Sequence, residues 1–182
     1  MRLLTAISAS AVLLSSTSAS AMSDARAQDA ADAFSQLCVA MFVGREPGVD
    51  PQRFNVTQLS DATREQIKPH IKASTLWDVH AKASDASMLM HYDPQGICVV
   101  EIAEADEHSV QRAVAQVAVD TAASLNTAAI IQPSETRQVE GLTATTLSWR
   151  FPSRGNDVLI MLTTVPVAKF MIQHVLTISY VS

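Results

Sequence analysis

The chain has 182 residues, of which 48% are hydrophobic and 17% charged, and its formal net charge is -5. This length suits one globular domain, and the apolar content excludes intrinsic disorder, which requires few apolar residues and a high net charge. The acidic balance argues against binding to nucleic acid or to an anionic membrane surface, because both require a basic face.

The N-terminal segment has the parts of a secretory signal peptide. Arg2 precedes an apolar stretch over Leu3–Leu14, and small residues then lead to Ala19-Ser20-Ala21. A basic start, a short apolar run and an exit of small residues are what the export machinery recognises. The run is too short to cross a bilayer, which takes about 20 apolar residues. We therefore predict a protein exported to the periplasm or the extracellular space, without a membrane span.

The cleavage site sets the domain organisation. A cut after Ala21 removes residues 1–21, and a second A-x-A pattern, Ala25-Arg26-Ala27, places the alternative cut after Ala27. Residues 28–182 contain no linker, repeat or low-complexity stretch. They are expected to form a single domain.

The two cysteines, Cys38 and Cys98, both lie in the exported part of the chain. They are too far apart for a C-x-x-C redox pair and too few for a structural zinc site. Disulfides form and persist in the compartments to which exported proteins go. We predict a Cys38–Cys98 disulfide, and two buried free thiols are the alternative.

Helical periodicity marks three segments. Residues 28–43 place apolar side chains at positions i, i+3, i+4 and i+7, with Gly44 able to end the helix. A short helix is predicted over 61–68 and a second main helix over about 107–125. The stripe of the first helix consists of Phe34, Leu37, Cys38 and Met41.

The middle of the chain changes to the alternating pattern of strands. Strands are predicted from Ser74 to His80, over Ser87–Tyr92 and over Ile97–Ala103, and Pro94–Gly96 form a three-residue hairpin loop. This loop fixes the register, because a slip of one residue would turn every side chain to the other face. The expected pairs are Tyr92 with Cys98, Met90 with Val100 and Met88 with Ile102, which directs Cys98 toward the core.

The remaining strands are predicted over Ala129–Gln132, Arg137–Phe151, Asp157–Val165 and Met171–Val181. The tight hairpins indicate antiparallel pairing. The predicted fold is therefore α+β, with an antiparallel sheet of about six or seven strands and two main helices packed on one face. His174 falls on an apolar face of the last strand, where we expect a hydrogen-bonded core histidine.

One group of residues is a candidate site. The register places Asp78, His91 and Glu101 on the sheet face opposite Cys98, with Leu89 between the two carboxylates. His80 and His91 lie about 13 Å apart along the strands, too far to share one zinc ion. Polar side chains on the outer face of an antiparallel sheet are also common without any function.

The residues around the cysteines resemble a known group of proteins. The helix with Phe34, Leu37 and Cys38, and the strand Gly96-Ile97-Cys98-Val99-Val100, are similar to small exported proteobacterial proteins of unknown function. The resemblance covers two short patches. It implies an envelope location and a cysteine pair, and it implies no activity and no catalytic residue.

The sequence contains none of the common nucleophile, metal or phosphate motifs. We therefore expect a non-enzymatic binding or envelope-accessory protein that recognises a protein or small ligand and holds no cofactor or metal. The alternative is a small hydrolase or metal-dependent enzyme that uses Asp78, His91 and Glu101. A further alternative is an oligomer that pairs through Met171–Val181 as an exposed edge strand.

Overall fold

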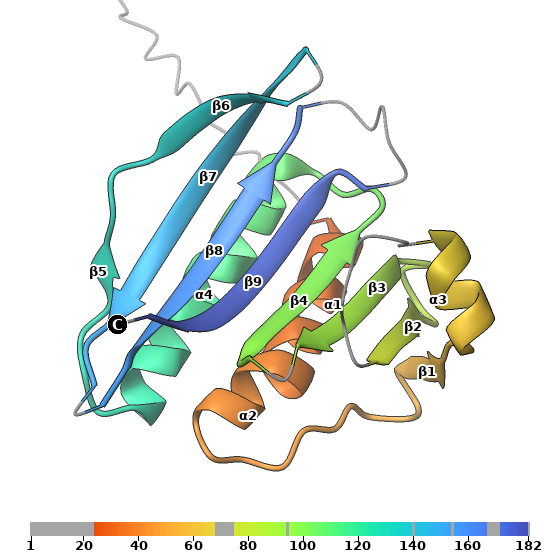
Figure 1. The fold of residues 1–182 in the computed structure, drawn as a ribbon, viewed down its shortest axis with the longest axis horizontal. Helices are drawn as coiled ribbons and strands as arrows, with labels where there is room; N and C mark the ends of the chain where they lie inside the picture. The colour runs from red at the N-terminus through yellow and green to blue at the C-terminus, as the bar shows by residue number, and fades with distance from the viewer. Residues whose placement is uncertain are drawn as a thin grey trace, which may run out of the picture.

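The chain folds into one large antiparallel sheet with its main helices against one face (Figure 1). The computed structural model describes residues 24–67, 75–93, 95–139, 141–153, 155–166 and 172–181, so the predicted signal peptide lies outside the described residues. In chain order the elements are α1 Ala25–Ala33, the π-helical segment η1 Phe34–Val39, α2 Ala40–Phe42, β1 Phe54–Gln58, α3 Asp61–Ile67, β2 Thr75–Ala81, β3 Ser87–Asp93, β4 Ile97–Ile102, α4 Glu107–Ser124, β5 Ile130–Ile131, β6 Glu135–Val139, β7 Leu142–Phe151, β8 Asp157–Thr164 and β9 His174–Val181.

The order of the strands divides the fold into two similar halves. The sheet runs β1-β2-β3-β4-β9-β8-β7-β5, and β6 also pairs with β7. In the first half α1, η1 and α2 precede the meander β1 to β4, and in the second half α4 precedes β5 to β9. The last strands of the two halves, β4 and β9, pair in the middle of the sheet. This arrangement confirms the predicted α+β class.

The described sheet has nine strands, so the predicted number of six or seven is too low. β1 was not predicted, because Phe54 is its one buried residue and the strand lacks an alternating pattern. The strand predicted over Arg137–Phe151 is in fact the hairpin of β6 and β7. The chain turns at Gly141, whose φ of 82° is readily adopted only by glycine.

The hairpin of β3 and β4 confirms the predicted register. Tyr92 pairs with Cys98, Met90 with Val100 and Met88 with Ile102. The loop closes through a hydrogen bond of 2.9 Å from the Gly96 amide to the Asp93 carbonyl, with Gly96 at a φ of 85°. Turn chemistry and apolar alternation agree here, which is why this part of the sheet was predictable.

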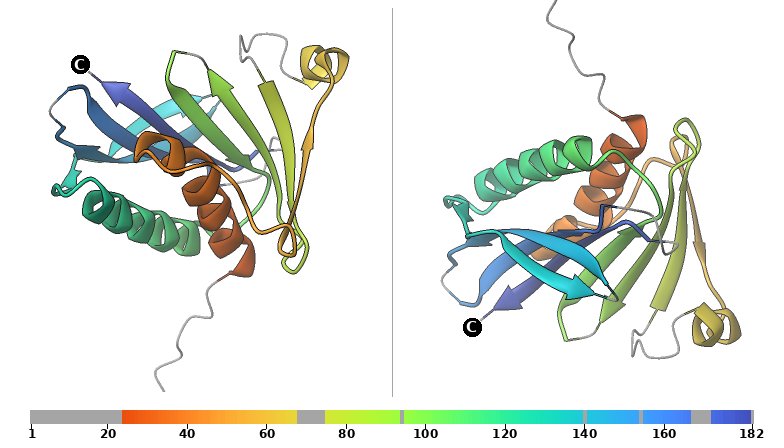
Figure 2. Two further views of the ribbon diagram at one scale, coloured as in Figure 1. Left: turned by 90° about the horizontal axis from the view of Figure 1, so that it is seen from below. Right: turned by 90° about the horizontal axis from the view of Figure 1, so that it is seen from above.

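Both main helices lie on the same side of the sheet, and together they cover the core (Figure 2). β8 alternates partly exposed and buried residues along its whole length, with the buried ones facing the helices. Fully burying one large aliphatic or aromatic side chain stabilises the fold by roughly 1.5–3 kcal/mol. The largest fully buried apolar side chains belong to Phe34, Val39, Leu76, Val79, Met88, Ile102, Phe151, Ile160, Leu162, Leu176 and Ile178.

The predicted disulfide is present and joins η1 to β4 through Cys38 and Cys98. Both cysteines are fully buried, which follows from their positions on the apolar stripe of the helix and on the helix side of β4. The wider π-helical turn around Cys38 was not predicted. The same apolar residues form one stripe in an α-helix, so their spacing does not reveal the local widening.

A single carboxylate holds the starts of both main helices. Asp24 accepts hydrogen bonds from the Arg26 amide at 3.0 Å, which caps α1, and from the Asp106 amide at 2.7 Å, directly before α4. Burial raises the pKa of Asp24, but these hydrogen bonds and the Arg26 guanidinium outweigh it, so the pKa lies below its ordinary 3.8. The two helices are thus fixed relative to each other at their N-termini.

His174 is fully buried and hydrogen-bonded at both ring nitrogens, as predicted for a core histidine. Its Nε2 lies 3.0 Å from the Ala105 carbonyl, which can only accept, so Nε2–H is the donor. In the neutral ring Nδ1 then accepts from the Thr164 hydroxyl at 3.0 Å. Burial holds the pKa of His174 below its ordinary 6.5, although the Ala105 carbonyl opposes this.

The last strand is not at an edge of the sheet. β9 lies between β4 and β8 and pairs with both along its length. The prediction that Met171–Val181 forms an exposed edge is therefore wrong, and an oligomer through this strand loses its basis. The edges of the described sheet are β1 on one side and β5 with β6 on the other.

Candidate functional site

The side of the sheet opposite α1 and α4, which we call the outer face, carries the residues predicted from the sequence. Pairing places Asp78, Leu89 and Glu101 in one row across β2, β3 and β4. The next row contains His91, between Leu76 and Val99. This is the placement that the sequence predicted.

The structure brings His91 and Glu101 together and leaves Asp78 apart. His91 Nε2 lies 3.9 Å from Glu101 Oε1, and the two residues are only 9% and 7% exposed. Asp78 is partly exposed and is separated from Glu101 by the side chain of Leu89. The outer face is thus much less solvated at this pair than predicted. Within the described residues no three His, Cys, Asp or Glu side chains are placed to hold a metal ion.

The His91–Glu101 pair can hold or move a proton, but hydrolysis also needs a nucleophile or an activated water. The hydroxyl that follows His91 in its own row, beyond Val99, is that of Thr177. Thr177 lies two strands away from His91, which is roughly 10 Å and too far for a hydrogen bond. The described residues of this row therefore place no hydroxyl nucleophile next to His91.

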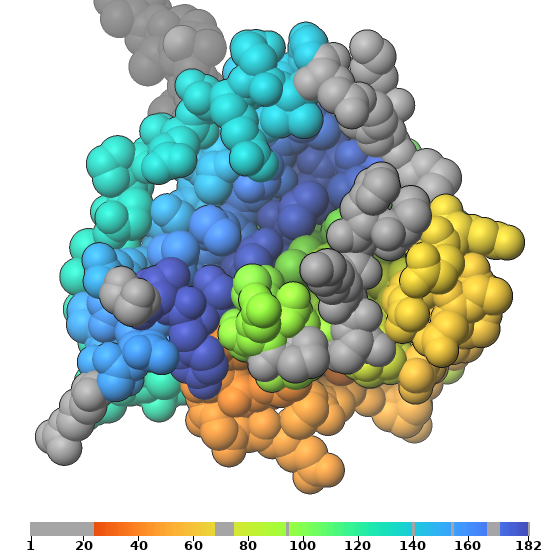
Figure 3. Space-filling view, viewed as in Figure 1, coloured from red at the N-terminus to blue at the C-terminus, as the bar shows by residue number. Residues whose placement is uncertain are grey.

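A groove lies on the outer face over β7, β8 and β9. Two hollows of about 370 and 350 Å³ share Glu135, Thr146 and Met161 and so form one continuous groove. Figure 3 shows the hollow, with β8 and β9 in blue at its floor and β6 in teal at its rim. The floor is made mainly of hydroxyl and aliphatic side chains, including Thr146, Ser148, Met161, Thr163, Val175 and Thr177.

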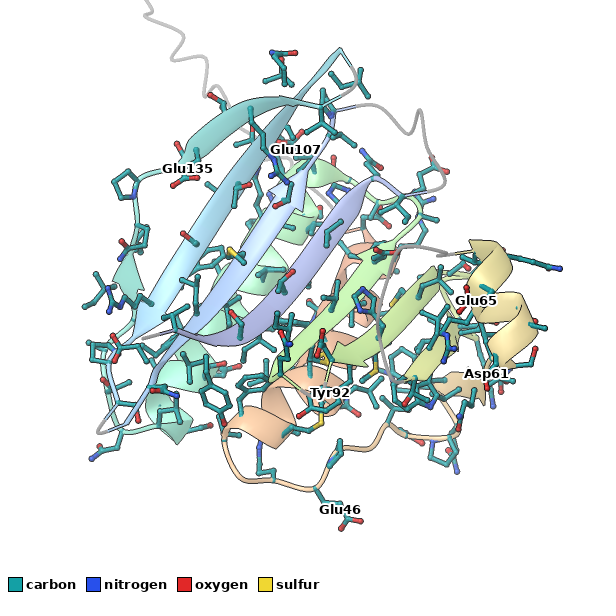
Figure 4. The ribbon with its side chains drawn as sticks, viewed as in Figure 1. Glu46, Asp61, Glu65, Tyr92, Glu107 and Glu135 are labelled. Atoms are coloured by element: carbon teal, nitrogen blue, oxygen red, sulfur yellow. A yellow bond between two sulfur atoms is a disulfide. The ribbon has the colours of Figure 1, made fainter. Side chains whose placement is uncertain are left out.

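The rim of the groove is built by the chain from Gln132 to Arg137. Pro133 has no N–H to continue a strand ladder, and pairing with β7 is interrupted between β5 and β6. β6 then leans over the outer face (Figure 2). Glu135, labelled in Figure 4, lies on β6 at this rim.

The groove carries few uncompensated charges. Arg150 at one end forms an ion pair with Asp157, with 2.6 Å between Nε and Oδ2. The backbone N–H of Ser153 and then the Arg150 guanidinium hold the pKa of Asp157 below its ordinary 3.8. Glu135 and Arg137 on the rim have opposite signs. An uncharged polar ligand suits this surface better than a strongly charged one.

The groove and the predicted residues belong to one surface. In the ladder of β4 and β9, Glu101 pairs with Val175 and Val99 pairs with Thr177. Val175 and Thr177 line the groove, so its floor continues toward the His91–Glu101 pair. Sequence reasoning located this pair and missed the groove.

A signal for the groove was nevertheless present in the sequence. The outer face of an antiparallel sheet usually carries charged and polar side chains. The outward positions of β8 and β9 carry aliphatic and hydroxyl residues instead, with Asp157 at the end as the one charge: Leu159, Met161, Thr163, Val175, Thr177, Ser179 and Val181.

Comparison of the chain with family models, with curated proteins and with solved structures finds no match in any of the three. The function must therefore be argued from the site itself. Among the described residues, no helix has the length and apolar character needed to pass through a bilayer.

Proposed function

We propose that this is an exported, non-enzymatic binding protein that holds an extended, largely uncharged segment of polypeptide in the groove on the outer face. The observation that carries the proposal is the groove itself, with its floor of hydroxyl and aliphatic side chains on β7, β8 and β9. The ligand would lie across Met161, which lines both hollows.

The dimensions of the groove fit an extended chain. Along β8 it reaches from Leu159 to Thr163, which is about 13 Å, the length of roughly four extended residues. A serine or threonine hydroxyl both donates and accepts, so it can bind either the N–H or the C=O of a peptide. Aliphatic neighbours supply apolar contact for alternate side chains.

Other ligand classes fit less well. None of the described residues that line the two hollows is aromatic, so they offer no stacking surface for a sugar ring or a base. The ion pair with Asp157 compensates the positive charge of Arg150, which weakens its attraction for an anion at that end. A neutral polypeptide segment remains the best match to the lining.

Export to the periplasm or the extracellular space belongs to the same proposal. It is supported by the signal-peptide pattern of residues 1–21 and by the disulfide, which persists in oxidising compartments. The fold favours cleavage after Ala21 over cleavage after Ala27. A cut after Ala27 would remove Asp24, whose carboxylate fixes the starts of α1 and α4.

The test uses the full chain with ¹³C-labelled methionine methyl groups and short synthetic peptides of neutral, acidic and basic composition. We expect the neutral peptides to shift the NMR signal of Met161 and to leave that of Met90, on the other face, in place. No shift of Met161 with any peptide, or equal shifts of both signals, would overturn the proposal.

Two matched variants locate the site. Ser148→Lys places a long charged side chain on the floor and should weaken peptide binding about tenfold or more, because the ligand would have to desolvate the ammonium group. Ser87→Lys makes the same change at an exposed strand position outside the groove and should leave the affinity unchanged. Peptide cleavage detected by mass spectrometry and abolished in His91→Ala would favour the hydrolase instead.

A further inference from the structure

A second pocket lies on the opposite side of the sheet, between the helix and the first three strands. Its volume is about 210 Å³. Leu37 and Met41 form the helix wall, Pro47 comes from the following loop, and β1, β2 and β3 contribute the rest. These strand residues are Val56, Trp77, Met90 and Tyr92.

Two contacts hold the helix wall of this pocket against the sheet. The Cys38–Cys98 disulfide ties η1 to β4, next to Leu37 in the sequence. Further along the chain Phe42 of α2 packs on Tyr180 of β9, the strand next to β4, with 4.7 Å between the ring centroids. Both contacts fix the helix from the β4 and β9 side, and the pocket lies on its other side, over β1 to β3.

The loop wall is fixed as well. The Gly48 amide donates a hydrogen bond of 3.1 Å to the Gln36 carbonyl, which draws the loop back onto η1 and holds Pro47 in place. The Arg45 amide makes a second bond of 2.8 Å to the Ala40 carbonyl. A preformed pocket binds without the cost of ordering its own walls.

The lining is almost entirely apolar, and none of the described residues that form it is charged. Two methionines add flexible, polarisable surface that adapts to different shapes. The volume is below that of drug-sized sites, yet an engineered apolar cavity of roughly 150 Å³ in another protein binds benzene. Val56 at the rim is 41% exposed, so the pocket is accessible from solvent.

We infer that this pocket is a second binding site, which takes the short alkyl chain of a small amphiphile and leaves its polar end in water. The site lies on the other face of the sheet from the groove, so the assignment does not rest on the proposed peptide binding. The walls come from η1, α2, their following loop and β1 to β3, all of which belong to the first half of the fold.

The test titrates the full chain with a series of straight-chain alkanols of increasing length. Trp77 lines the pocket and should shift its fluorescence to shorter wavelength as the chain displaces water. Trp149 lies in the core, and a Trp149→Phe background isolates the signal of Trp77. Each added methylene should tighten binding about fourfold until the pocket is full, after which the affinity should level off.

Two valine variants on edge strands locate the site. Val56→Phe narrows the rim and should weaken alkanol binding at least about tenfold, whereas Val139→Phe, at an exposed valine of β6, should have no effect. Far-UV circular dichroism establishes that both variants fold. The levelling of affinity with alkanol length is measured on the wild-type protein, so this part of the test does not depend on either variant.

Three results would overturn the assignment: no shift of Trp77 emission with any alkanol, affinity that rises with chain length without levelling off, or equal weakening by the two variants. Phosphatidylcholine vesicles provide a final comparison. A response to vesicles with none to free alkanols would indicate docking on a lipid surface and would also count against the pocket.

Discussion

Removing the disulfide should destabilise the protein more than a typical single substitution on its surface. Cys38 and Cys98 close a loop of 60 residues that contains β1, β2 and β3. In the chain-entropy model, a loop of this size restricts the unfolded chain enough to stabilise the fold by roughly 4 kcal/mol. Typical domains have only about 5–15 kcal/mol in total, so the loss would be a large fraction of the free energy of unfolding.

The assay is urea denaturation of the wild-type protein and of the Cys38→Ala, Cys98→Ala double variant, followed by tryptophan fluorescence. The expected result is a fall of roughly 4 kcal/mol together with a larger m-value, because the uncrosslinked chain exposes more surface when it unfolds. The wild-type protein with its disulfide reduced is the control, since it keeps both buried sulfur atoms. A fall below about 1 kcal/mol in the reduced protein would refute the loop-closure reasoning.

Two further predictions concern single residues. The pKa of His174 is lower in the folded than in the unfolded protein, so its contribution to stability is fully present above pH 6.5 and is lost as the pH falls below it. The loss amounts to at most about 1.4 kcal/mol of unfolding free energy per pH unit. His174→Gln should flatten the dependence of this free energy on pH below 6.5, measured by urea denaturation at a series of pH values. An unchanged slope in the variant would contradict the role of His174. Gly141→Ala should lower the free energy of unfolding by about 1 kcal/mol or more, because φ is 82° there and alanine is strained at that angle. Gly48→Ala is the matched control: that site has open space and no positive φ, so a comparable loss there would show that strain is not the cause.

The disulfide and the β3–β4 hairpin could be predicted because several local signals agree. The apolar stripe directs Cys38 inward, and the three-residue loop ending at Gly96 fixes the register that directs Cys98 inward. Each signal is independent of the other, and both specify the same face. Agreement between propensity, pattern and turn chemistry is what makes a segment predictable.

Two of the edge strands, β1 and β6, could not be predicted as separate strands, and the reason is physical. All five residues of β6 are exposed, and four of the five in β1 are exposed. A strand that buries almost nothing has no reason to alternate apolar with polar residues, so it leaves no period of two in the sequence. Pairing with a neighbour creates these strands, and only the fold reveals the neighbour.

The position of the candidate site was predicted from the sequence, but the burial of its residues was not. The register of β2, β3 and β4 correctly placed Asp78, His91 and Glu101 on the outer face. The register does not show how deeply these side chains are buried, because the exposure of a strand depends on segments distant in sequence. The groove was not predicted for the same reason, since its rim near Glu135 comes from a strand without a sequence signal.

The two halves of the fold share one architecture, so the different surfaces they carry must arise from their side chains. In the first half the outward positions of β2 to β4 include titratable residues, among them Asp78, His91 and Glu101. In the second half Arg150 and Asp157 neutralise each other, and hydroxyl and aliphatic side chains form the floor of the groove. On the helix side of the sheet the first half carries the distinctive features, because the disulfide and the apolar pocket both belong to it. The groove and the apolar pocket lie on opposite faces and differ in the chemistry of their linings, so the two proposed sites call for two ligands of different chemistry.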